Sequence, residues 1–182
     1  MAGEGITVGF DPRELLSFQA AATALSDDRL RQALREALNA AGGKTRTQVR
    51  RALREQTNVK AAKDINDRTK SFIVAGELAY RIEAINKALP IDRVKGLTVQ
   101  MGAGGGVYAA PWGVGREFKR SFVVNGRYLA RLGHERFPVR ALFGPSVMKE
   151  LTKDQSRETF ETFAVAELER QVVGKLQRFL AM

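Results

Sequence analysis

Apolar side chains recur at helical spacing over two long stretches that lie near opposite ends of the chain. The first runs from about Asp27 to Gln56 across Gly42-Gly43 and predicts one long helix, bent or closely packed at the glycines; two helices with a break are the alternative. The second begins near Asp154 and predicts a long amphipathic C-terminal helix with a structural apolar stripe. Its apolar positions are Phe160, Phe163, Ala164, Leu168, Val172, Leu176, Phe179 and Leu180.

Shorter stretches alternate apolar and polar side chains, as half-buried strands do. Gly5 to Phe10 predicts a first strand, and Asp11-Pro12 then opens a helix that runs through Leu25. Further elements are predicted in chain order: a short helix within 58–70, strands at 78–82, 97–101 and 107–109, and a glycine-rich loop at 102–106 that joins the last two strands as a hairpin.

The stretch from Phe122 to Ser146 carries the strongest strand signals. Asn125-Gly126 stands between two apolar runs, and because both residues tolerate positive φ, the pair predicts a hairpin. A third run follows with Pro138 near its start; proline lacks an N–H, so this strand is expected at an edge or beginning at the proline. Gly144-Pro145 ends the strand, and Pro145 suits the first turn of a new helix.

This order of elements predicts an α+β fold in a single domain spanning 1–182. Residues 1–70 are expected to be mainly helical, including one long helix. Residues 71–145 are expected to form an antiparallel sheet of about four to five strands with a long glycine-rich hairpin loop, and residues 146–182 the C-terminal helix. A chain of 182 residues buries roughly 70% of the surface that its unfolded form exposes, which is enough for a real core.

The composition speaks against an enzyme. The chain has no cysteine and one histidine, His134, in a polar turn, so thiol chemistry is excluded and a histidine-ligated metal site lacks ligands. The glycines of 102–106 precede β-type residues rather than the lysine and helix of a phosphate-binding loop. No apolar run reaches the roughly 20 residues of a membrane-spanning helix, and no signal peptide opens the chain. We expect a non-enzymatic cytoplasmic protein with no cofactor, no metal site and no membrane contact.

Basic side chains, which give the chain a net charge of +10, gather in two places. Arg46, Arg50 and Arg54 form a stripe beside the apolar stripe of the first long helix. The second concentration comprises Arg116, Lys119, Arg120, Arg127, Arg131, Arg136 and Arg140. Solvated surfaces explain both; the functional alternative is contact with an acidic protein or with DNA phosphates. Because few aromatic residues interleave with the cations, sequence-specific recognition of nucleic acid is not expected.

The loop region around the glycines contains Tyr108 and Trp112, aromatic residues that need burial or a partner. Trp112 either anchors its own loop or anchors an interface, where tryptophan is enriched. The glycine run is either a mobile hairpin tip or a segment that orders against a neighbouring subunit. The candidate assembly interface comprises Tyr108, Trp112, Arg116, Arg46, Arg50 and Arg54.

Several segments resemble the minor tail protein Z family of tailed bacteriophages and prophages, which are tail-completion proteins. The resemblance is sharpest over Phe122 to Ser146: a hairpin with arginine in its second strand, then Arg136-Phe137-Pro138-Val139-Arg140, then Leu142-Phe143-Gly144-Pro145-Ser146. Weaker likeness extends to Ile6-Thr7-Val8, Leu38-Asn39-Ala40-Ala41 and Thr45-Arg46-Thr47-Gln48-Val49-Arg50.

The resemblance implies a structural virion protein at the head-proximal end of a long tail. It implies a hexameric ring that acts in head-tail joining, with a tail terminator or tail-tube protein and head-tail connector proteins as neighbours, and with non-specific contact to DNA in the channel. Assembly would take place in the host cytoplasm. Two alternatives stay open: another neck component, such as a tail terminator or connector, and a basic nucleic-acid-binding protein.

Overall fold

The computed structural model describes residues 5–9, 28–74, 78–100 and 106–180, which form the α+β fold that the sequence predicts. The helices are α3 (Asp28–Thr57), α4 (Ala62–Asn66), α5 (Val147–Leu151) and α6 (Asp154–Leu180), with the 3-10 helices η1 (Ile91–Arg93) and η2 (Pro111–Gly113). The strands are β1 (Gly5–Gly9), β2 (Thr69–Ile73), β3 (Ala79–Ala84), β4 (Thr98–Val99), β5 (Val107–Ala109), β6 (Arg116–Phe118), β7 (Ser121–Val124), β8 (Arg127–Arg131) and β9 (Val139–Ala141). The helix expected from Asp11 to Leu25 and most of the glycine-rich loop lie outside the described residues.

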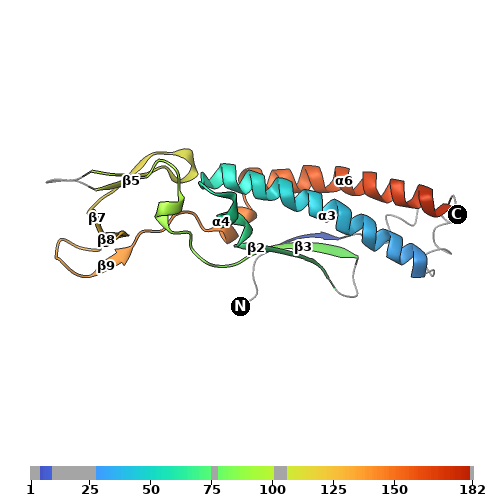
Figure 1. Ribbon diagram of the computed structural model, residues 1–182, viewed down its shortest axis with the longest axis horizontal. Coiled ribbons are helices and arrows are strands. Elements are labelled where there is room, and N and C mark those ends of the chain that lie inside the picture. The colour runs from blue at the N-terminus through green and yellow to red at the C-terminus, as the bar shows by residue number, and fades with distance from the viewer. Residues whose placement is uncertain (1–4, 10–27, 75–77, 101–105, 181–182) are drawn as a thin grey trace.

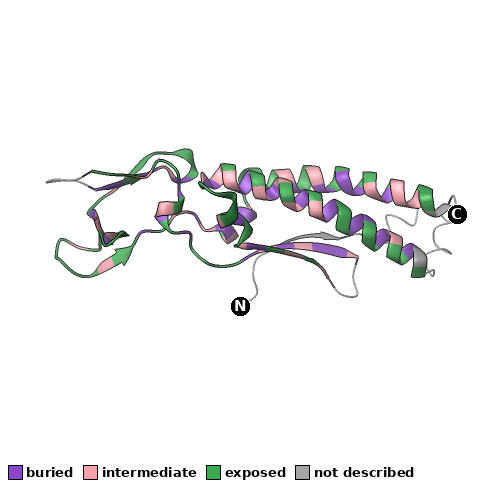
Figure 2. Cartoon of the chain, in the orientation of Figure 1, coloured by how far each residue is buried: buried purple, intermediate pink, exposed green. Residues whose placement is uncertain are grey.

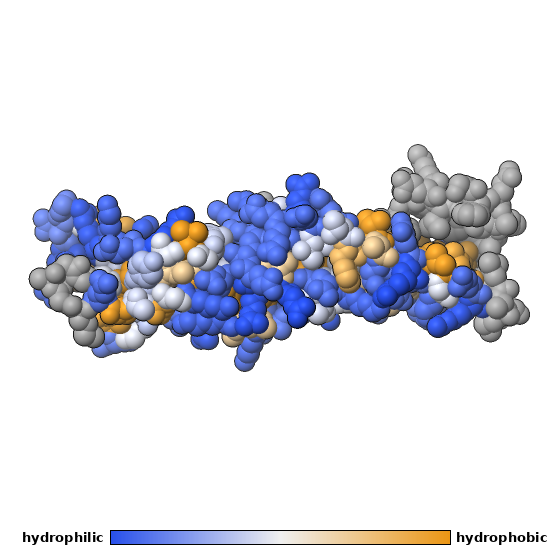
Figure 3. Space-filling view, turned by 90° about the horizontal axis from the view of Figure 1, so that it is seen from above, coloured by the Kyte–Doolittle hydropathy of each residue, from blue (hydrophilic) through white to orange (hydrophobic). Residues whose placement is uncertain are grey.

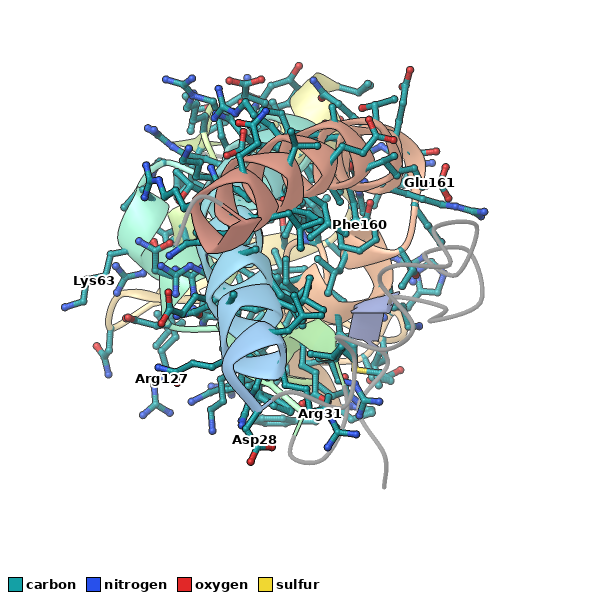
Figure 4. The ribbon with its side chains drawn as sticks, turned by 90° about the vertical axis from the view of Figure 1, so that its right-hand side faces the viewer. Asp28, Arg31, Lys63, Arg127, Phe160 and Glu161 are labelled. Carbon is teal, nitrogen blue, oxygen red and sulfur yellow. The ribbon has the colours of Figure 1, made fainter. Side chains whose placement is uncertain are left out.

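Helices α3 and α6 lie side by side and antiparallel, and they make up one half of an elongated molecule (Figure 1). Their facing sides carry the core, with Leu38 and Leu53 on α3 and Leu168 on α6 buried, while the outer sides are exposed (Figure 2). Phe160 points inward beneath α6, whereas its neighbour Glu161 points away from the body (Figure 4). Both long helices are therefore confirmed. On α6 the predicted apolar positions Phe160, Ala164, Leu168 and Val172 are buried, and Phe163 and Leu176 are half-buried.

The first of the two adjacent glycines lets a strand pack closely on α3. A Cβ atom at Gly42 would lie 2.3 Å from Cγ of Tyr80, which is buried on β3 and hydrogen-bonded through its hydroxyl to Oγ of Ser71 at 3.0 Å. Helix α3 is continuous across this point, so the two-helix alternative is wrong and close packing explains Gly42.

The strands form three separate three-stranded antiparallel sheets, in the orders β1-β3-β2, β4-β5-β6 and β7-β8-β9, rather than one sheet of four to five strands. The first sheet packs against α3, and the other two lie beyond the C-terminal end of that helix (Figure 1). Residues 85–97 carry the chain away from β3 through η1 before β4 begins, which separates the first sheet from the other two. We call residues 98–143, which contain β4 to β9, the β end.

The hairpin at Asn125-Gly126 is confirmed, since these residues have φ of 49° and 72° and join the paired strands β7 and β8. Strand β9 begins at Val139, after Pro138, and lies at a sheet edge as expected. Pro145 lies outside the first turn of α5 and not within it, because Ser146 is the N-cap residue and has an extended backbone (φ −85°, ψ 113°).

Candidate assembly interface

Tyr108, Trp112 and Arg116 lie together at the β end. Antiparallel pairing of β5 and β6 places Ala109 opposite Arg116, and η2 connects the two strands. Trp112 is 42% exposed, and the Arg116 guanidinium lies 5.6 Å from the centre of its ring, within range of a cation–π interaction. The exposed Tyr108 covers Gly115 so closely that a Cβ atom there would lie 1.7 Å from the phenol oxygen. These three predicted interface residues therefore form one exposed cluster.

Arg46, Arg50 and Arg54 lie on α3 and bind their own chain. Arg50 donates from Nε to Oγ1 of Thr69 at 2.7 Å and from Nη2 to the carbonyl oxygen of Thr69 at 2.8 Å. Arg46 donates to Oγ of Ser71 at 3.2 Å, and Arg54 donates to the carbonyl oxygen of Lys60 at 2.8 Å.

The arginine stripe of α3 thus fastens β2 and the segment after α3 to the helix, with all three side chains half-buried. Burial, followed by the neighbouring charge of Arg46, lowers the pKa of the Arg50 guanidinium. Helix α3 contacts η2, but no hydrogen bond or ion pair among the described residues joins the arginine stripe to the Trp112 cluster. A role of the stripe in assembly stays a prediction.

The second basic concentration is exposed throughout and lies at the β end. Besides Arg116 over Trp112, two more of its arginines lie over aromatic rings: Arg131 is 5.3 Å from the centre of the Phe122 ring, and Arg136 is 5.9 Å from that of Phe137. Glu117 and Glu135 are the acidic residues of the fully described segment 106–144, so this end of the molecule is strongly positive.

Large apolar side chains lie exposed beside these cations, and the sequence patterns did not single them out. They are Val114, Val124, Leu132, Phe137 and Phe143, and Phe137 has 68% of its surface exposed. The pattern around Pro138 is that of an ordinary strand, and only the three-dimensional arrangement shows that Phe137 and Phe143 are exposed. Aromatic and arginine side chains together are typical of protein interfaces.

A buried acid on α6 was also missed by the sequence patterns. Glu167 lies on the side of α6 that faces α3 and accepts hydrogen bonds from Nζ of Lys44 at 2.7 Å, Nη2 of Arg170 at 2.8 Å and Nε2 of Gln171 at 2.7 Å. Hydrogen bonds from Lys44 and then from Arg170 outweigh burial and lower the pKa of Glu167 to about 2. The signal that could have identified it is its place in the sequence: Glu167 comes three residues after Ala164 and directly before Leu168, so helical spacing puts it beside the apolar stripe.

Glu167→Gln should remove a pH-dependent part of the stability. Between pH 4.5 and about 2 the unfolded chain takes up a proton at Glu167 that the folded chain does not, so the native protein loses stability as pH falls through this window. At pH 7 we expect the variant to be less stable by about 1–3 kcal/mol, moderated by solvent around the two exposed cations.

Denaturant titrations at several pH values measure this difference. Glu158→Gln is the matched control, because Glu158 is an exposed acid on the same helix with no ion pair among the described residues, and it should stay within about 0.5 kcal/mol of the wild type. Parallel pH profiles of wild type and Glu167→Gln below pH 4.5 would contradict the role given to Glu167.

The described residues contain no group of three or more histidine, cysteine, aspartate or glutamate side chains placed to hold a metal ion. Within the same ranges, none of the helices combines the length and apolar character needed to span a bilayer. Comparison with known proteins found no matching family model, no matching characterised protein and no matching solved structure. The functional assignment therefore depends on the geometry of the β end and on the sequence resemblance.

Proposed function

We propose that this chain is a non-enzymatic structural subunit of a phage tail. It acts as a tail-completion protein at the head-proximal end and forms a hexameric ring during head-tail joining. The observation that carries the proposal is the β end, where exposed aromatic side chains and exposed arginines gather on the same segment, 122–146, that resembles the minor tail protein Z family.

The exposed aromatic residues favour an assembly subunit over an isolated protein. Burying a side chain such as Trp112 or Phe137 stabilises an association by about 1.5–3 kcal/mol, so several of them on one end provide a strong driving force. Tryptophan and arginine are also the residues most often found at energetic hot spots of interfaces. The arginines add attraction to acidic neighbours, which salt weakens.

The proposed neighbours are other copies in the ring, a tail terminator or tail-tube protein, and head-tail connector proteins. The exposed cations of the β end would also tolerate DNA that passes through the channel without reading its sequence. In this proposal the mature protein resides in the virion.

Removing Trp112 should prevent normal assembly. A variant that lacks residues 102–106 and carries Trp112→Ala should form smaller oligomers and join fewer heads to tails, because a lost hot spot of about 2 kcal/mol weakens association roughly 30-fold. Native mass spectrometry measures the oligomer, and electron microscopy counts joined particles.

Phe72→Ala is the control for that variant, since Phe72 is an aromatic residue with a similar exposure of 43% on β2, away from the β end. It should assemble like the wild type. Unchanged oligomer size and normal joining in the Trp112→Ala deletion variant would refute the proposed role of the cluster.

The exposed arginines of the β end also support the second candidate function, nucleic-acid binding. Tight binding of duplex DNA by a monomeric protein, with an affinity that falls steeply as salt rises, would favour that function over ring assembly.

A further inference from the structure

The β7-β8-β9 sheet has one face against the core and one face open. Along β8, Arg127, Leu129 and Arg131 point to one side, and Tyr128 and Ala130 point to the other, because side chains alternate along a strand. Ala130 belongs to the buried core and Tyr128 packs against it. The side with the arginines is therefore the open one.

Strand register extends this open side across the sheet. Phe122 lies opposite Leu129, and Val139 lies opposite Arg131 on the edge strand. We name as the open sheet face the residues Phe122, Val124, Arg127, Leu129, Arg131, Val139 and Ala141, none of which belongs to the core or packs against it. Its centre is apolar and its two arginines lie at the ends of β8, one of them over the Phe122 ring.

A second uncovered surface runs along α6, on the side opposite α3. Glu158, Thr162, Val165, Glu169 and Val173 follow one another at helical spacing, and we name them the outer stripe. Val165 and Val173 are 57% and 53% exposed, and the surface seen from above shows apolar patches over α6 among polar side chains (Figure 3). Glu158 and Glu169 are exposed and have no ion pair within the described residues.

We propose that the open sheet face of one copy docks on the outer stripe of α6 in the next copy. The charges are complementary, with two arginines on the sheet and two glutamates on the helix. Arg127 and Arg131 are about 13 Å apart along an extended strand, and Glu158 and Glu169 are about 17 Å apart along a helix, so long arginine side chains span the difference. Leu129 then lies between the arginines where Val165 lies between the glutamates.

The docking rests on the proposed ring and supplies one contact between its copies, in addition to the Trp112 cluster. The two surfaces lie on different parts of an elongated molecule (Figure 1), so each copy offers one surface to each of two neighbours. Such a head-to-tail contact forms a ring when the rotation between neighbouring copies brings the last copy onto the first. Nucleic acid is a poorer occupant of the open sheet face, because its centre is apolar and the valines of the outer stripe would stay uncovered.

Reversing the charges on each surface separately tests this contact. Arg127→Glu with Arg131→Glu places acid against acid, and Glu158→Arg with Glu169→Arg places base against base. Each double variant should associate at least about 100-fold more weakly than the wild type, because like charges face one another. An equimolar mixture of the two should restore assembly, since every contact in an alternating ring again pairs opposite charges.

The matched control is Arg136→Glu with Arg140→Glu, which makes the same charge change at the β end but outside the open sheet face, and it should assemble like the wild type. Circular dichroism verifies that each variant is folded, and native mass spectrometry measures assembly.

The docking contact is overturned, and the proposed function still stands, if the wild type forms rings and both double variants assemble normally. The same holds if the wild type forms rings and the mixture of the two double variants does not recover assembly. A wild type that stays monomeric overturns the proposed function. Loss of DNA binding in the arginine variant alone, with no recovery on mixing, assigns the open sheet face to nucleic acid and overturns the docking.

Discussion

Alanine at Gly42 and alanine at Gly43 should change the stability of this protein in opposite directions. At Gly42 the new methyl group would lie 2.3 Å from Cγ of the buried Tyr80 ring, so the ring or the helix must shift. Overpacking of this kind costs about 3 kcal/mol, while replacing glycine inside a helix returns about 1 kcal/mol. The net effect expected for Gly42→Ala is therefore a loss of about 2 kcal/mol.

At Gly43 a Cβ atom meets no other atom within 4 Å, so only the gain in helix propensity applies. Gly43→Ala should be more stable than the wild type by about 0.5–1 kcal/mol. For a chain of this size the melting temperature should fall by roughly 4–8 °C in the first variant and rise by roughly 1–4 °C in the second. Thermal and urea denaturation of the two proteins measure the difference. Equal shifts in both variants would show that α3 and β3 are not packed through Gly42.

Local features of this fold could be predicted from the sequence because their causes are local. Asn125-Gly126 predicts its hairpin from the conformations that two residues tolerate, and α3 and α6 follow from the spacing of their own apolar residues. The role of Gly42 needed Tyr80, which comes from a strand far along the chain. Helical spacing shows that the helix continues, but it does not show which ring lies against it.

Long-range pairing is the part that the sequence could not give. Each strand signal was real, but nothing local shows that β6 and β7 belong to different sheets, and hence that the chain forms three sheets. The residues of the candidate site likewise divide into those that are close in sequence and those whose surroundings depend on long-range packing. Tyr108, Trp112 and Arg116 are close in sequence and do gather, whereas Arg50 is bound to Thr69, whose position depends on how β2 packs.

The exposed surfaces of the β end also depend on long-range packing and could not be predicted from the sequence. The alternation along β8 predicts that one side of the strand is buried, but it does not say which side stays open after folding. Leu129 and Tyr128 are equally plausible inward residues in the sequence, and the structure places Tyr128 against the core. An apolar face with arginines at its ends therefore becomes visible only when the sheet is placed relative to the helices.

Leu168→Asp should destabilise the protein more than any exposed substitution on the same helix. Leu168 is buried between α6 and α3 and lies close to Leu38, Ala41 and Tyr80. Removing a buried leucine costs about 2–5 kcal/mol, and an aspartate at this site is also desolvated. It would stand next to Glu167, whose carboxylate is ionised and already bound to its own partners. We expect a loss of at least about 4 kcal/mol, or a chain that does not fold.

Three further variants separate the causes of that loss. Ala166→Asp introduces the same acid at an exposed position of α6 and should cost less than about 1 kcal/mol. Leu168→Ala removes packing without charge, and Leu168→Asn has the shape of aspartate but does not titrate. Burial disfavours the charged carboxylate, so the stability difference between Leu168→Asp and Leu168→Asn should be largest at pH 7 and should narrow as pH falls toward about 4, where the acid becomes neutral. If Leu168→Asp melted like Ala166→Asp, this face of α6 would be open to solvent or to a partner, and α3 and α6 would not share a core.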